Sequence, residues 1–300
     1  MKKSELILRK KWKRLMNNDS QDILAPIHFA DELLLNEIDR ICKKYKIEYF
    51  IWGGTMLGAV RHQDFIHWDD DVDVIFKRKE YNKFRKVVRR ELKPEFEYVY
   101  PGEDGIFFDM IGKIIYRDSQ LGKSTEETAF YKERFNKVSL DLFVLDDVAP
   151  GFLFRLQLIM AKAVYGMAMA YRYKLDYSKY SLTGKIAAGG LSTFGKLFGL
   201  KRLIRMYNFL SRSGSREAKE YFISNDTPPV IFQHYDKKWF ETPVYLNIRE
   251  KKYPVPVGYK AILSYIYGDY MKLPSEEKRK PKHIYDCNEL KVYYKGEIII

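Results

Sequence analysis

The fold is decided by residues 52–74, which read WGGTMLGAVRHQDFIHWDDDVDV and place two glycines ahead of a run of aspartates. The end of this stretch, Asp71-Val72-Asp73-Val74, alternates acidic and apolar residues, which is typical of a β-strand with two different faces. Asp71 and Asp73 therefore project from one face of a strand predicted over 71–76, about 7 Å apart. Two carboxylates held in this way repel each other and cannot be buried cheaply without a cation.

A divalent cation would relieve that repulsion, because Mg²⁺ binds one or two carboxylates together with phosphate oxygens and water. Gly53 and Gly54 allow a close approach of backbone to phosphate, and Thr55 can cap the short helix that follows. Arg61 and His62 add positive charge at the end of that helix. An isolated acidic run is usually a solvated turn, but this one leads into an apolar strand. We therefore expect a site for Mg²⁺ or Mn²⁺ and a phosphate-bearing ligand.

The flanking segments alternate between helical and extended patterns. Upstream, a helix is predicted over 26–46 and a short strand over 47–52. The helix has an apolar stripe formed by Ile27, Ala30, Leu34, Ile38 and Ile41. Downstream, we expect a mixed-charge helix and three strands, over residues 78–92, 95–100, 106–117 and 138–145. This order predicts an α/β (α+β) fold with a mixed β-sheet core and flanking helices.

Composition is that of a globular protein. Hydrophobic residues make up 46% of the 300 and charged residues 31%, which suffices for a core without a disulfide or metal staple. Cys42 and Cys287 offer neither a disulfide framework nor a paired zinc site. The basic start holds only the apolar run Leu6–Leu8, too short for a signal peptide or a membrane span. We therefore expect a cytoplasmic protein.

Positive charge is concentrated in the second half of the chain. Residues 1–150 hold 27 basic and 27 acidic side chains, whereas residues 151–215 hold 11 basic side chains and one acid, Asp176. A local block of this kind indicates a surface that meets an anionic partner, either nucleic acid or an anionic membrane. Within it, 152–175 is apolar, and glycines at 189, 190 and 195 are expected to break the segment after it.

Residues 200–212 predict a helix with two contrasting faces. Leu200, Leu203, Ile204, Tyr207 and Leu210 share one face. The basic residues of the other face are Lys201, Arg202, Arg205 and Arg212. This division is typical of an interfacial helix on an anionic membrane, where each basic residue contributes about 1 kcal/mol. An ordinary amphipathic helix packed on the core gives the same pattern.

Residues 53–74 resemble the signature of the LicD family of phosphocholine transferases, which belongs to the nucleotidyltransferase-fold superfamily. Fukutin-related sugar-phosphate transferases carry a similar string. Residues 139–146, SLDLFVLD, are similar to a later strand of the family. Residues 267–274, YGDYMKLP, with His283 after them, resemble its C-terminal motif. One departure is His67, where the family usually has proline, and we expect no chemical consequence.

The resemblance covers roughly residues 26–150 and 235–285, and it implies a division of the chain. The expected parts are a basic N-terminal segment (1–25), a nucleotidyltransferase-like catalytic core (26–150), a basic amphipathic helical insertion facing membrane or substrate (151–225) and a C-terminal region that completes the catalytic domain (226–300). A strand-and-turn pattern begins near residue 228, and a helix is predicted over 258–267.

The family pattern implies a set of metal ligands. Asp71 and Asp73 would bind the metal, with a third carboxylate on a neighbouring strand, and Asp141 fits that position. An acid in an apolar strand needs a partner, which could also be a lysine. Lys113, in another predicted strand, would face the phosphates or the solvent.

The resemblance also implies a reaction. Phosphocholine would pass from CDP-choline, or a related CDP-linked donor, to a sugar hydroxyl of a cell-envelope glycan such as teichoic acid or lipopolysaccharide, with release of CMP. Gly53, Gly54 and Thr55 would hold phosphate oxygens, Arg61 would stabilise the leaving CMP, and Asp141 would bind metal or accept the proton. A lipid-linked acceptor would place the enzyme on the inner face of the cytoplasmic membrane, at an anionic surface.

Three alternatives stay open. The same fold could transfer glycerol phosphate, ribitol phosphate, another sugar phosphate or a whole nucleotide. A nucleic-acid-binding module would show steep salt dependence, but the sequence carries no recognition motif for nucleic acid and the acids would be unexplained. A catalytically inactive scaffold is disfavoured by the intact acids.

Overall fold

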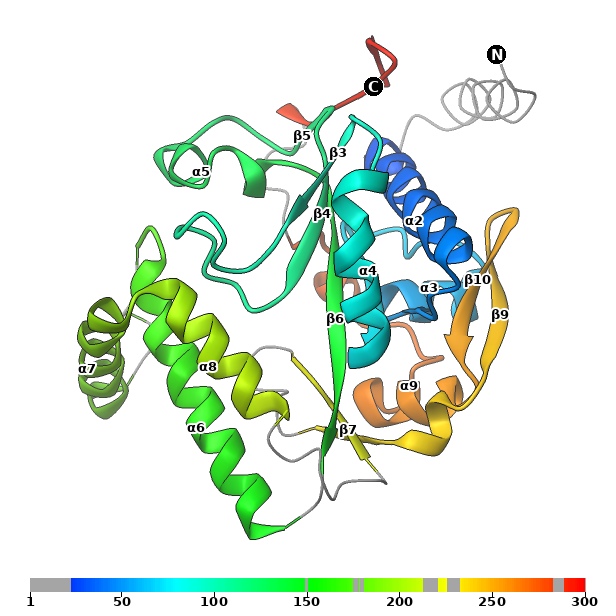
Figure 1. Ribbon diagram of the computed structural model, residues 1–300. Coiled ribbons are helices and arrows are strands. Elements are labelled where there is room, and N and C mark those ends of the chain that lie inside the picture. The colour runs from blue at the N-terminus through cyan, green and yellow to red at the C-terminus, as the bar shows by residue number, and fades with distance from the viewer. Residues whose placement is uncertain are drawn as a thin grey trace.

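The computed structural model describes residues 23–148, 151–174, 178, 181–212, 221–225, 233–282 and 289–299. The N-terminal segment predicted over 1–25 lies almost wholly outside these ranges, as do Asp176, His283 and Cys287. A mixed sheet with strand order β1-β2-β6-β4-β3 runs through the centre of the molecule, and β7 pairs with the end of β6 and with β8 (Figure 1). Its strands are β1 (Phe50–Ile51), β2 (Val72–Lys77), β3 (Phe96–Val99), β4 (Gly112–Tyr116), β6 (Ser139–Val148), β7 (Tyr221–Ser224) and β8 (His234–Asp236).

Helices cover the sheet, and shorter strands lie around it. The helices are α2 (Ala25–Tyr45), α3 (Gly53–Arg61), α4 (Arg78–Glu91), α5 (Glu126–Phe130), α6 (Phe152–Ala168), α7 (Leu182–Phe198), α8 (Leu200–Arg212) and α9 (Tyr259–Tyr267). The remaining strands are β9 (Pro243–Ile248) with β10 (Lys251–Pro256), and β5 (Ser119–Gln120) with β11 (Lys291–Tyr294) and β12 (Glu297–Ile298). The α/β (α+β) prediction is confirmed.

Helices α2 and α4 pack on one face of the sheet because each has an apolar stripe (Figure 1). The five apolar residues predicted for the first helix are fully buried in α2, so that prediction is confirmed. In α4, Tyr81, Phe84, Val87 and Val88 are buried at three- and four-residue steps. The opposite face of β2 is therefore left for its acidic side chains.

Two strand predictions need correction. The segment 106–117 forms a strand only from Gly112 onward. The Oδ1 atom of Asp104 accepts hydrogen bonds from the backbone N–H groups of Ile106 and Phe107, each at 3.0 Å, and these bonds compete with strand pairing. The strand predicted over 47–52 shortens to β1, which pairs with β2 only through Phe50 and Ile51.

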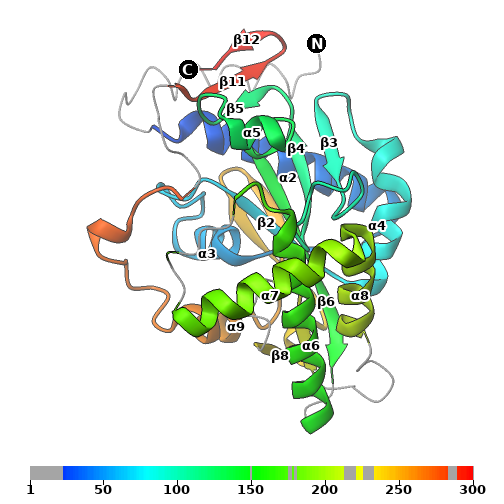
Figure 2. The same cartoon turned by 90° about the vertical axis from the view of Figure 1, so that its left-hand side faces the viewer.

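Helices α6, α7 and α8 form a second packed unit beside β6 (Figure 2). The prediction that glycines interrupt the segment before residue 200 is wrong, because α7 is continuous and Ser181 caps it by accepting a hydrogen bond from Gly184 N. Gly195 lies so close to the carbonyl of Met167 that a Cβ there would collide with it. Among the described residues, no helix combines the length and apolar character needed to cross a bilayer.

The helix predicted over 200–212 is confirmed as α8, but its apolar stripe is not available to a membrane. Leu200, Leu203, Ile204 and Tyr207 are buried in the core shared with α6. The four basic residues of the opposite face are exposed. The stripe belongs to the core because packing against α6 and β6 removes its apolar surface from water. The membrane-facing role of the four basic residues stays a prediction.

Candidate active site

Three strands bring charged side chains to one level of the sheet. In the parallel pair β2 and β6, Asp73 lies opposite Asp141, and in the antiparallel pair β6 and β4, Lys113 lies opposite Asp141. Lys113 forms an ion pair with Asp141. The third acid predicted for a neighbouring strand therefore lies beside Asp73, and its lysine partner is also present. Lys113 is mostly buried in this pair and does not extend into solvent.

The electrostatics of this row favour a cation. Burial, followed by the charges of Asp71 and Asp141, raises the pKa of Asp73 well above its usual range, and Lys113 opposes that shift. Burial also raises the pKa of Asp109, which interacts with the same lysine. The ammonium group of Lys113 therefore interacts with several carboxylates, which still repel one another.

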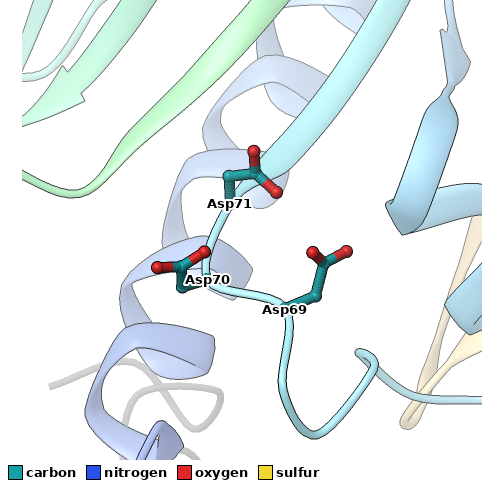
Figure 3. Close-up of side chains that lie close together, drawn as sticks. All are labelled: Asp69, Asp70 and Asp71. Atoms are coloured by element: carbon teal, nitrogen blue, oxygen red, sulfur yellow. The ribbon is translucent and has the colours of Figure 1, made fainter. Parts of the chain in front are cut away.

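A second group of acids lies at the turn that leads into β2. Figure 3 shows Asp69, Asp70 and Asp71 projecting from this turn, and one carboxylate oxygen of each lies within 4.8 Å of the others. Asp70 is buried and accepts a hydrogen bond from Lys282 N at 3.2 Å. Behind them on α2, Asp31 is fully buried, and neither of its carboxylate oxygens has a hydrogen-bond partner. Burial and the charges of Asp71, Asp69 and Asp70 raise the pKa of Asp31.

The carboxylates of Asp73 and Asp69 leave no room for a side chain at Gly53 and Gly54. Gly53 has φ +52°, and a Cβ there would lie 2.6 Å from Asp73 Oδ2. A Cβ at Gly54 would collide with Asp69 Oδ2. Both carboxylates therefore lie against the N-terminus of α3, where the helix dipole favours negative charge. A contact of these glycines with phosphate stays a prediction.

The other residues predicted around the glycine motif have defined partners. Thr55 is buried, and its Oγ1 accepts a hydrogen bond from Asp73 N at 2.9 Å, which fixes the start of β2 against α3. Arg61 donates to His62 Nε2 at 2.9 Å and to the carbonyl of Tyr270 at 3.2 Å. Burial and then Arg61 lower the pKa of His62, so its neutral ring orients the guanidinium.

A cleft of about 760 Å³ opens over the acids. Gly54, Arg61, Asp69, Asp71 and Asp73 line one side. The rest of the lining comes mainly from residues 267–282, which contribute Lys272, Lys278, Lys280 and Lys282 and one acid, Asp269. The aromatic residues of the lining are Trp68, Tyr267 and Tyr270. The remaining predicted residues, Gly53, Thr55, His62, Lys113, Asp141 and the four basic residues of α8, are not among those that line this cleft.

Sequence reasoning missed this basic wall and four of the acids, Asp31, Asp69, Asp70 and Asp109. The lysines of residues 272–282 lie some two hundred positions after the aspartates, although their density in a proline-punctuated segment was a readable signal. Asp69 was visible in the acidic run. Asp31 and Asp109 gave no signal, because a single acid in a helix or loop is normally solvated.

The donor set fits a divalent cation. Hard cations prefer carboxylate oxygens, and several carboxylates are gathered here around a fully buried acid without a hydrogen-bond partner. Asp71 belongs to the turn and also interacts strongly with Asp73. The predicted ligands Asp71 and Asp73 are therefore close to each other, with Asp141 beside Asp73.

Comparison with known proteins gives consistent matches. Residues 46–145 match the family described as LicD/FKTN/FKRP, nucleotidyltransferase domain. Over 272 residues the chain is 28% identical to the lipopolysaccharide cholinephosphotransferase LicD of Haemophilus influenzae, covering 85% of this chain and 93% of that protein. It is 26% identical over 208 residues to the protein RP689 of Rickettsia prowazekii, covering 67% of this chain and 64% of that one.

Proposed function

Because the chain is a member of the LicD family, we propose that it is a metal-dependent transferase that moves phosphocholine from CDP-choline to a sugar hydroxyl of a lipopolysaccharide-like glycan. The observation that carries this proposal is the cleft that Asp71 and Asp73 line together with the four lysines of residues 272–282. Acids that hold a cation and lysines that neutralise phosphate are together suited to a nucleoside diphosphate donor.

In the proposed reaction, the sugar hydroxyl oxygen forms a bond to the phosphorus that bears choline. The bond from that phosphorus to the bridging oxygen breaks, and CMP leaves with this oxygen. Asp71 and Asp73 would hold Mg²⁺ or Mn²⁺, which supplies charge neutralisation on the diphosphate. Arg61 and the lysine wall would stabilise CMP as it leaves. Asp141, oriented by Lys113, would complete the ligand set or accept the hydroxyl proton.

The choline group would meet the aromatic part of the cleft. Trp68 lines the cleft, and the guanidinium groups of Arg61 and Arg279 lie 5.7 and 5.5 Å from its ring centroid. Tyr267 and Tyr270 line the same cleft. We propose these three rings as the contacts of the quaternary ammonium, because aromatic faces attract such cations.

The test is CMP release from CDP-choline by the wild-type chain and by Asp71→Asn and Asp73→Asn, with Mg²⁺ present. We expect each variant to lose at least a hundredfold in rate while its circular dichroism is unchanged, since loss of electrostatic stabilisation costs this much. Near-normal turnover in either variant would refute the ligand assignment. CDP-glycerol and CDP-ribitol serve as parallel donors, and exclusive use of one of them would assign a different cargo.

The acceptor would be attached to lipid, as in lipopolysaccharide or teichoic acid assembly. We propose that the chain then works as a peripheral protein on the inner face of the cytoplasmic membrane. The positive charge of residues 151–215 supports this proposal.

A further inference from the structure

Helix α7 presents an apolar stripe that the protein itself does not cover. Leu182, Ile186, Phe194 and Leu197 expose 76%, 70%, 59% and 74% of their surface. They recur at steps of four, eight and three residues and therefore share one side of the helix. Of the residues of α7, only Gly195 is buried, where the helix contacts α6.

The surroundings of this stripe are positively charged. Lys185 and Lys196 are exposed and fall along one edge of the stripe at 100° per residue. Residues 151–215 hold a single acid, Asp176. The helix is outermost on the side of the molecule shown in Figure 2, where α3 and β2 are also in view.

We infer that the stripe of Leu182, Ile186, Phe194 and Leu197 is the surface by which this chain enters an anionic lipid bilayer, with Lys185 and Lys196 at the level of the headgroups. This inference rests on the membrane association proposed above and assigns it to α7, because the corresponding stripe of α8 is buried in the core. Helix α7 would lie in the interface plane, as an amphipathic helix with an apolar side and basic edges does.

The positive charge beside the stripe favours an anionic bilayer over a second copy of the chain as the partner of this surface. Two copies meeting through this face would bring the same lysines toward each other, and like charges oppose association. Anionic headgroups complement these lysines.

The experiment is co-sedimentation of the full chain with vesicles of phosphatidylglycerol and phosphatidylcholine in equal parts. We expect the variant L182S/I186S/F194S/L197S to bind at least tenfold more weakly than wild type. The matched control Tyr245→Ser with Val257→Ser replaces exposed apolar side chains elsewhere and should bind normally. K185E and K196E should each weaken binding about fivefold or more, since a basic residue near the surface contributes about this factor. K79E and K86E on α4 are the charge controls.

Binding of the four-substitution variant at the wild-type level, or no vesicle binding by wild type, would overturn the inference. A wild-type dimer that the same variant converts to a monomer, without vesicle binding, would assign the stripe to a second copy instead. CMP release with a soluble sugar acceptor should be unchanged in the stripe variant. If neither wild type nor the stripe variant releases CMP while wild type still binds vesicles, the transferase proposal is refuted and the assignment of the membrane surface is kept.

Discussion

Replacing Lys113 with methionine should destabilise the protein, because this lysine is the counter-charge of the acid row. The side chains of Lys113 and Asp141 are only 14% and 19% exposed, so the pair is shielded from solvent. Removing one partner of a buried pair costs about 3–5 kcal/mol, and the residual exposure here puts our expectation just below that range, at about 2–3 kcal/mol. Methionine keeps most of the volume, so the loss is chiefly electrostatic.

The assay is urea unfolding of wild type, K113M, D141N and K113M/D141N, all at the same pH. The double variant should recover most of the stability lost in K113M, because no unpaired carboxylate remains at this position. The control is K77M, whose partner Glu48 is 32% exposed and whose loss should cost less than about 1 kcal/mol. A K113M variant within about 0.5 kcal/mol of wild type, or additive effects in the double variant, would refute this reasoning.

Further predictions concern the glycines and the acids. Gly54→Ala should displace the Asp69 carboxylate and lower the free energy of unfolding by about 1–3 kcal/mol through overpacking. The control Gly105→Ala has open space around it but φ +76°, so it measures the cost of backbone strain alone. Equal losses of stability in the two variants would contradict a collision at Gly54. Burial and neighbouring acids raise the pKa values of Asp31 and Asp73, so the folded chain binds protons more tightly than the unfolded chain. Without metal, the unfolding temperature should therefore fall as pH rises from about 4 through the raised pKa values of Asp31 and Asp73. An unfolding temperature that does not change with pH would contradict the electrostatic repulsion among these acids.

The pattern of single elements could be predicted from the sequence, but their pairing could not. Alternation predicted the strand that carries Asp73, although β2 begins at Val72 and leaves Asp71 in the turn before it, and three- to four-residue steps defined α2. No local signal states that β6 pairs in parallel with β2 in the register that sets Asp141 beside Asp73, or that β4 brings Lys113 to the other side. These contacts depend on the packing of the whole sheet.

Two helices show how tertiary contacts change the meaning of a pattern. The stripe of α8 was interpreted as that of a membrane helix, with a core helix as the alternative, and its contact with α6 decides for the core. The glycines of α7 indicated a break, yet Gly195 is needed where the helix approaches Met167, and the helix continues through it.

The account depends most directly on whether the acids bind a divalent cation. Mn²⁺ binding, measured by electron paramagnetic resonance titration of wild type and Asp73→Asn in the presence of CDP-choline, tests this claim. We predict that wild type takes up one ion and that the variant binds it at least tenfold more weakly. Equal Mn²⁺ affinity in the two proteins would contradict the claim that these carboxylates hold the metal.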